Sequence, residues 1–477
     1  MLTTTVDRDS RLLRWRRVRE FAVPPSMIET ATARRRNGDW AGACAAAHLD
    51  VDLDLRTAAR TYGTDFASQV RADLRHLAPD LLRWHMPRIA PDGLLRPGLT
   101  VALARYAGPG PRSPVSLVAR TPPAWADAGQ RISLALWDPS RTEPSALRHP
   151  HPHPSRLHRL DLHRHLWDDR RTDELRLRCG ADPRAEGGHL AQDPEVAALL
   201  PPGCAVDRWA AEAEILVGAG ETHGGGSTGS PTVSVPLLPG RHWLLAADRP
   251  NADDNSPPGT LTWRVTPEVL GRRRGRVRSG PVPPVLPYAA AWALPDLELL
   301  DAGLIDIGLL HPLVASALRP GRPPSTADPR AASGSSRRLI ECRGERHRIG
   351  VVDGVLVPLD HPPDEVRREE LLAALTGTPL PCLQVIDDAH RRPGCLPGVR
   401  ERLDHGDFTG ALAVVEDLLG PAALLRDGAL RDELESAAQR RLTHGLFRAG
   451  LIGGPPPRTA RPRQLPPRPP RRVPTTR

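Results

Sequence analysis

Residues 338–377 read RLIECRGERHRIGVVDGVLVPLDHPPDEVRREELLAALTG, and this stretch decides the fold class. Three runs in it are rich in apolar and β-branched residues, as is typical of strands: 338–342, 346–352 and 355–359. Asp353-Gly354, between the last two runs, is a preferred two-residue turn of a β-hairpin. The stretch therefore predicts antiparallel strands joined by short turns.

A helix is predicted directly after these strands. Pro362-Pro363 suits its start, Asp364-Glu365 places negative charge in its first turn, and Gly377 ends it. A further strand is predicted over 382–387, and helices follow to the end of the segment. Residues 337–453 are therefore predicted to be a small α+β module, independent of the N-terminal half of the chain.

The preceding sequence shows the same mixture of patterns. Helices are predicted over 25–47, with a turn at Asn37-Gly38-Asp39, and over 64–84. Residues 49–55 alternate leucine or valine with aspartate, which predicts either a short strand with one acidic face or a loop entering a helix. Six strand-like runs follow: 99–106, 115–120, 131–137, 232–238, 242–247 and 260–265. We expect them to form one antiparallel sheet with a His/Pro/Gly-rich insertion at 139–230.

Composition divides the chain into seven segments. They are a basic N-terminal segment (1–24), an α+β region (25–270), an Arg/Pro linker (271–287), a helical segment (288–318), a second linker (319–336), the small module (337–453) and a Pro/Arg-rich tail (454–477). The 54 prolines and 41 glycines make up a fifth of the chain, so much of its length must be turns and connections. The tail has too few apolar groups to pack and is predicted to be disordered.

The charge pattern excludes several classes of enzyme. The chain has no lysine, so its 65 basic residues are all arginine, and it has no P-loop, kinase or Schiff-base lysine. The net charge is +9, but residues 454–477, 271–280 and 1–20 alone carry +7, +5 and +3, so the rest of the chain is acidic. These arginine-rich segments make salt-sensitive contact with nucleic acid an alternative function.

Histidines form the densest group of possible metal ligands. Six lie between 149 and 165, and we take His158, His163 and His165 as the candidate metal site because His163-x-His165 would share one strand face. No cysteine or fixed carboxylate near them in sequence completes a tetrahedron. A metal protein or enzyme that uses this insertion is a second alternative, whereas no catalytic residue and no cofactor-binding residue is predicted elsewhere.

Residues 406–415, GDFTGALAVV, resemble the helix pair of an ankyrin repeat, and residues 442–451 resemble the second helix of the next unit. Val414 and Leu446 are 32 residues apart, close to the ankyrin period. The T-P-L-H turn of that family is absent, so any repeats are degenerate, and the same residues also resemble the interhelical turn of a tetratricopeptide repeat. As a whole the chain resembles proteins of high-GC actinobacteria that end in ankyrin-like helices. The resemblance implies protein binding, because stacked helix pairs offer concave surfaces.

The sequence contains no run of about 18 apolar residues and no apolar leader core, so we expect a cytoplasmic protein with no membrane contact. The six cysteines are scattered and are expected to be reduced. The predicted function is a non-catalytic interaction or scaffold protein with a protein partner.

Overall fold

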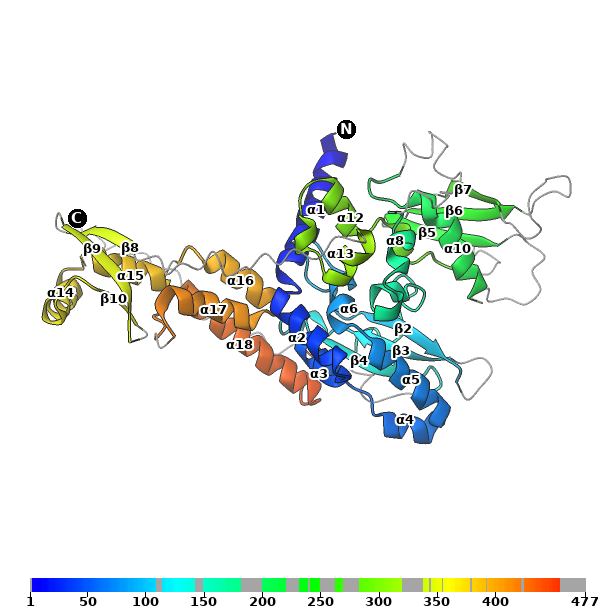
Figure 1. The fold of residues 1–477 in the computed structure, drawn as a ribbon, viewed down its shortest axis with the longest axis horizontal. Helices are drawn as coiled ribbons and strands as arrows, with labels where there is room; N and C mark the ends of the chain where they lie inside the picture. The colour runs from blue at the N-terminus through cyan, green and yellow to red at the C-terminus, as the bar shows by residue number, and fades with distance from the viewer. Residues whose placement is uncertain are drawn as a thin grey trace, which may run out of the picture.

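The structure is a computed structural model of the chain, and it has the mixed α+β composition that the sequence predicts. It describes residues 2–108, 114–141, 149–181, 200–219, 231–238, 241–248, 262–268, 283–319, 338–342, 345–353, 355–377, 380–391, 393–421 and 424–454. Figure 1 shows two regions: a body, formed by the described residues up to 319, and an arm, formed by those from 338 onward. The predicted tail beyond Gly454 and most of both predicted linkers lie outside the described residues.

Three helices begin the body: α1 (Leu2–Phe21), α2 (Pro25–Arg36) and α3 (Trp40–Ala46). The last two confirm the helix pair predicted over 25–47, and the carboxylate of Asp39 caps α3 by accepting the Gly42 N–H. Helix α1 was not predicted in the basic segment 1–24. Its Leu12, Trp15 and Val18 are buried at helical spacing, a stripe that the surrounding arginines conceal in the sequence.

The first sheet has four strands in the order β1-β4-β3-β2: β1 (Leu49–Val51), β2 (Thr100–Tyr106), β3 (Val115–Arg120) and β4 (Ile132–Trp137). Strand β1 is parallel to β4, and the other pairs are antiparallel. Helices α4 (Leu55–Tyr62), α5 (Thr64–His76) and α6 (Pro79–His85) follow β1 in the chain. Both alternatives for 49–55 are present, because β1 leads into α4, which Asp54 caps.

A second, separate sheet contains β5 (Thr232–Leu238), β6 (Arg241–Asp248) and β7 (Thr262–Glu268). The predicted strands are confirmed, but the prediction of one sheet is wrong. The outer edge of β2 is already occupied, because the backbone N–H groups of Ser155 and Asp161 donate to the carbonyl oxygens of Thr100 (2.8 Å) and Ala102 (2.9 Å). The second sheet instead packs on α10 (Trp209–Gly218) around its own core.

Short helices complete the body: η1 (Ala124–Ala126), η2 (Arg164–Leu166), η3 (Asp169–Arg171), α8 (Glu174–Arg178), η5 (Val206–Arg208), α11 (Tyr288–Ala291), α12 (Pro295–Asp301), η6 (Ile307–Leu309) and α13 (Pro312–Leu318). The helical segment predicted over 288–318 is thus confirmed, with Pro295 and Pro312 opening α12 and α13. Helix α12 is joined to α1 by the buried Arg19–Asp296 ion pair, whose closest N–O distance is 2.6 Å.

The arm begins with the predicted three-stranded antiparallel sheet, ordered β10-β9-β8: β8 (Arg338–Cys342), β9 (Glu345–Val352) and β10 (Val355–Pro358). Asp353, in the turn after β9, has the positive φ of 51° that this kind of turn requires. The predicted helix α14 (Pro363–Thr376) follows and ends at Gly377 in the left-handed conformation.

The predicted strand over 382–387 is wrong, because these residues belong to helix α15 (Pro381–Arg391). Their apolar run resembles a strand, but Cys382, Ile386 and Ala389 are buried at helical spacing. The first two of these pack with Ile349 of β9 in a small core beneath the sheet. Tertiary packing therefore decided between two local patterns of similar strength.

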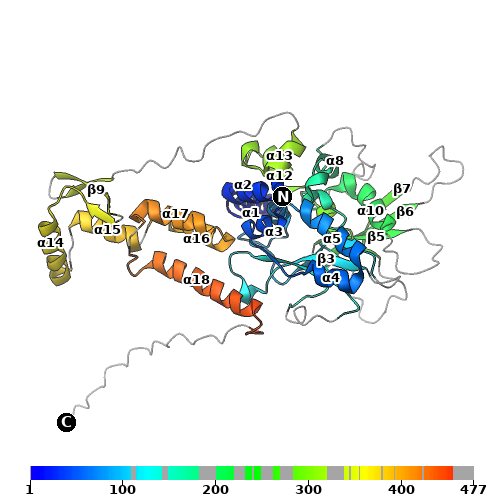
Figure 2. The same cartoon turned by 60° about the horizontal axis from the view of Figure 1, so that its bottom comes forward.

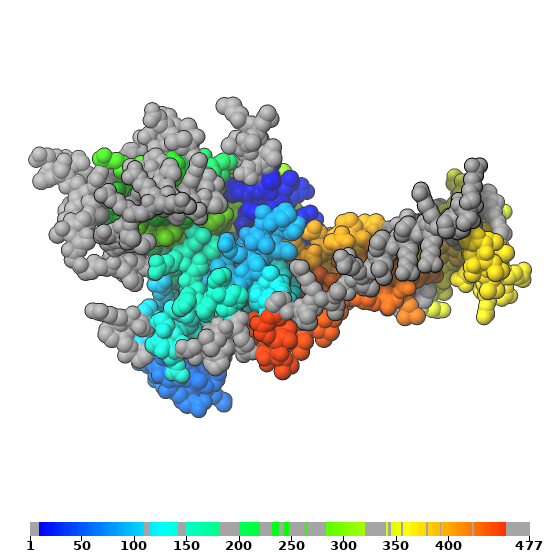
Figure 3. All heavy atoms as spheres, turned by 180° about the vertical axis from the view of Figure 1, so that it is seen from behind, coloured from blue at the N-terminus to red at the C-terminus, as the bar shows by residue number. Residues whose placement is uncertain are grey.

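Three helices join the tip of the arm to the body: α16 (Leu396–His405), α17 (Phe408–Leu419) and α18 (Ala429–Arg448). Figures 1 and 3 show them as the base of an arm that stands out from the body, with β8–β10 and α14 at its far end. Helix α18 is a single helix of 20 residues. Because it already includes residues 429–441, the separate helix that the ankyrin spacing placed at 442–451 is not confirmed.

Candidate interaction surface

The histidines proposed as metal ligands are buried inside the body. His163 donates from Nδ1 to the carbonyl oxygen of Arg159 (2.9 Å), and its Nε2 lies 3.2 Å from Oε2 of Glu212. The ring of His165 is 5.8 Å from that of His163, whereas His158 lies apart, beside Tyr288. Among the described residues, no group of three or more His, Cys, Asp or Glu side chains could hold a metal ion.

The carboxylate of Glu212 joins His163 to the rest of the body. Arg178 donates to both of its oxygens, each at 2.6 Å. Burial opposes ionisation of Glu212, but hydrogen bonds from His163 and Arg178 outweigh it and lower its pKa to about 2. Burial lowers the pKa of His165 well below its ordinary value, and the charge of His163 adds to this effect. The arrangement ties α10 to the segment before η2, which is a structural role.

A cavity of about 70 Å³ lies where α18 meets the first sheet. Its charged lining residues largely pair with one another: Arg131 donates from Nε to Asp50 (3.0 Å), and Arg448 binds both carboxylate oxygens of Asp52. Burial opposes ionisation of Asp50, but hydrogen bonds from His444 and Arg131 hold its pKa far below the usual range. These ion pairs around the cavity therefore join the β1 segment to α18.

Arg83 fixes the base of the arm to the body. It is fully buried, and it donates to the carbonyl oxygens of Ala22 (2.9 Å), His405 (2.7 Å) and Gln130. Burial lowers its pKa to about 10, which still leaves it charged at neutral pH. Arg83 therefore connects the end of α1, the loop before β4 and the last turn of α16 through backbone oxygens alone.

Further close contacts join the arm to the body. A Cβ added to Gly406, whose φ is 90°, would lie 2.1 Å from the carbonyl oxygen of Gly129. The Nδ1–H of His444 donates to the carbonyl oxygen of Ala126 (2.9 Å), and the rings of Trp125 and Phe447 meet edge to face. The module 337–453 is thus in contact with the body, and its predicted independence stays a prediction for limited proteolysis within 319–336 to test.

At the tip of the arm, by contrast with its packed base, helix α14 is exposed. Helix α14 has 14 residues and no buried side chain. Its Leu371 and Leu375 are 64% and 85% exposed, whereas Glu369 and Ala373 are half-buried. All three leucines of the helix are therefore exposed, while its half-buried side chains include Val366 as well as Glu369 and Ala373. An isolated helix of this length is only marginally stable in water.

The outer side of α18 is a second exposed apolar face. Leu442 and Leu446, one turn apart, are 64% and 42% exposed, and Ala438 in the preceding turn is exposed as well. The charged residues Arg431 and Glu435 continue this stripe toward the start of the helix, where they form an ion pair (2.6 Å). The sequence predicts both helices, but the direction of each leucine depends on packing that no local pattern contains.

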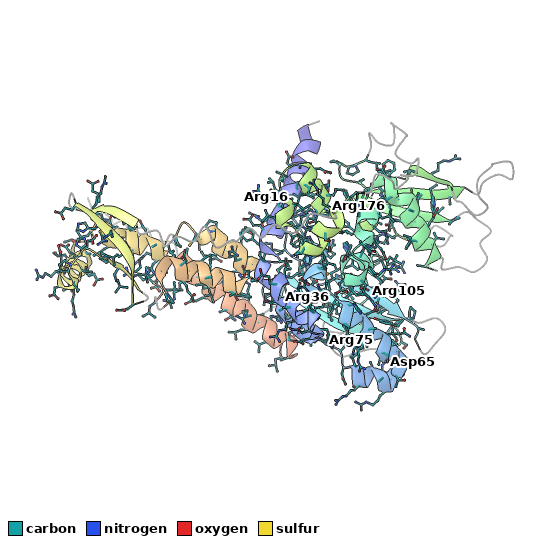
Figure 4. All side chains as sticks on the ribbon, viewed as in Figure 1. Arg16, Arg36, Asp65, Arg75, Arg105 and Arg176 are labelled. Atoms are coloured by element: carbon teal, nitrogen blue, oxygen red, sulfur yellow. The ribbon has the colours of Figure 1, made fainter. Side chains whose placement is uncertain are left out.

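The five arginines labelled in Figure 4, Arg16, Arg36, Arg75, Arg105 and Arg176, come from five different elements of the body. Most residues of the predicted nucleic-acid-binding segments, 271–280 and 454–477, lie outside the described part of the chain. No helix among the described residues has the length and apolarity to cross a membrane. Comparisons with protein-family models, curated proteins and solved structures give no match.

Proposed function

We propose that this chain is a cytoplasmic, non-catalytic protein-interaction protein that docks its partner at the tip of the arm. The observation that carries the proposal is α14, a 14-residue helix without a buried side chain whose Leu371 and Leu375 are exposed. Helices in proteins owe most of their stability to packing of an apolar face. A protein partner that covers these leucines would supply this packing, and burial of each leucine would contribute about 1.5–3 kcal/mol.

The base of the arm supports the same proposal. Helix α18 has 20 residues and so spans about 30 Å at the usual rise per residue. Arg83 and the contacts around Gly406 hold the base of the arm against the body through the end of α16, which leaves the tip accessible. The ankyrin-like resemblance of residues 406–415 favours the same class of function, because ankyrin repeats bind proteins through paired helices.

Affinity capture with matched variants tests this proposal. The full chain is immobilised and exposed to a cytoplasmic extract, alongside the double variant Leu371→Glu/Leu375→Glu. The control is Leu309→Glu, because Leu309 is 66% exposed on the body. We expect the wild type and the control to retain the same proteins and the double variant to lose them at least tenfold, roughly the effect of one binding hot spot.

Glutamate and leucine are both good helix formers, so the double variant should keep α14 helical, which circular dichroism would check. The proposal fails if the wild type retains no protein above background. It also fails if the double variant retains the same proteins as the wild type.

A further inference from the structure

The exposed face of α14 has a regular order of charge and apolarity. Asp364, Arg368, Leu371 and Leu375 are all exposed and are spaced by four, three and four residues. Residues at such intervals lie on one side of a helix. From its N-terminal end, this side of α14 therefore presents an acid, a base and two leucines.

The exposed face of α18 has the same spacing with the opposite charges. Arg431, Glu435, Ala438 and Leu442 are all exposed, again at intervals of four, three and four residues. If the two helices are laid side by side in parallel, Asp364 meets Arg431 and Arg368 meets Glu435. Leu371 then lies over Ala438, and Leu375 lies over Leu442.

The two helices do not make this contact within one chain. In Figures 1 and 2, α14 lies at the far end of the arm, and α15 and the strands of the tip lie between it and α18. Helix α15 contacts α18 directly and α14 stands beyond it. The complementary faces can therefore meet only between two copies of the chain.

We propose that a second copy of this chain covers both faces, with α14 of each copy packed in parallel along α18 of the other. This inference rests on the proposed function, in which the tip of the arm is the docking element, and it names the partner. A two-fold axis makes the contact reciprocal, so both leucine faces of both copies are covered. The leucines provide most of the affinity, and the exposed ion pairs chiefly fix the register.

The mass of the full chain in solution, measured by sedimentation and light scattering, tests the pairing. We expect the wild type to be a dimer at about 100 µM, well above the micromolar dissociation constants of weak interfaces. Leu375→Glu and Leu442→Glu should each raise the dissociation constant at least about tenfold, as loss of a hot-spot residue does. Leu309→Glu on the body should leave it unchanged.

Mixing these two variants tests whether the contact is reciprocal. In a mixed dimer, intact α14 of the Leu442→Glu chain meets intact α18 of the Leu375→Glu chain. One of the two contacts is therefore fully native, whereas each variant alone has a defect in both. The mixture should dimerise more tightly than either variant by itself.

Charge reversal tests the register. Arg368→Glu and Glu435→Arg should each weaken the dimer, and the double variant should bind more tightly than either single variant, because it restores opposite charges across the contact. The inference is overturned if the wild type is a monomer, if a dimer tolerates both leucine variants, or if the double reversal restores nothing. A monomer that still captures another protein through Leu371 and Leu375 would retain the proposed function and reject only this inference.

Discussion

The body and the tip of the arm use similar elements, small sheets flanked by helices, in opposite ways. In the body even charged groups are enclosed. Arg19 and Asp296 form an ion pair with each other, and their side chains are 1% and 0% exposed. The Trp84 indole N–H also donates to Asp296. At the tip, α14 buries no side chain and exposes its leucines. The difference shows that the contacts that hold the body together are internal, whereas the tip leaves apolar side chains exposed to solvent.

The body and the arm meet at Arg83, so its removal should have the largest effect. Arg83→Leu leaves the carbonyl oxygens of Ala22, Gln130 and His405 without this donor. Each unsatisfied buried acceptor costs about 1–3 kcal/mol, so the three together predict a loss of at least about 3 kcal/mol for the folded chain. Urea unfolding would measure the loss, and hydrogen exchange in α16 should increase at the same time.

The matched control is Arg34→Leu, because the Arg34 side chain is 60% exposed and, within the described part of the chain, its ion pair is with half-buried Asp39. Its effect should stay within about 0.5 kcal/mol, as for most surface substitutions. Equal effects of the two arginine variants would show that Arg83 does not fix the arm.

Acidification should weaken the same junction as well. Burial, with a contribution from Arg88, lowers the pKa of His405 to about 4, and burial and Arg83 lower that of His48 to about 3. Both histidines are neutral in the folded chain, while in the unfolded chain each binds a proton below about pH 6.5. Stability is therefore fully present above pH 6.5 and falls by about 1.4 kcal/mol per pH unit for each histidine as pH decreases toward 5.

Urea titrations at several pH values between 7 and 5 would show this slope. His405→Gln removes one titrating group at the junction. It should therefore reduce the slope of the unfolding free energy against pH by about 1.4 kcal/mol per pH unit. A slope identical in the wild type and in this variant would contradict the role of His405.

The smallest effect is expected at the tip. Leu375→Ser replaces a side chain that is 85% exposed, so it should change the unfolding free energy of the monomer by no more than about 0.5 kcal/mol. Leu82→Ala, at a fully buried position of α6, should cost about 2–5 kcal/mol. Unfolding at protein concentrations low enough to exclude association would compare them, and a large effect of Leu375→Ser would mean that α14 is packed within its own chain.

Local signals in the sequence were enough to predict much of the arm and the N-terminal helices. Asp353-Gly354 determined a hairpin, and Pro363 with Gly377 bounded α14. Sequence reasoning failed where two patterns competed, as in α15, whose apolar run at 382–387 also suits a strand. It also failed where distant segments compete for one strand edge, as at β2, and it could not predict that Leu371 and Leu375 face outward, because that depends on what packs beneath α14.

The way Arg83 holds the arm has a consequence for variation among relatives of this chain. Its acceptors are the backbone oxygens of residues 22, 130 and 405, and every amino acid offers the same oxygen at those positions. Relatives that keep the arm in this position should therefore retain an arginine at 83 and glycine at 406, where a Cβ would meet the backbone of Gly129. The residues that accept from the arginine are free to change independently, so correlated substitutions between body and arm would not reveal this joint.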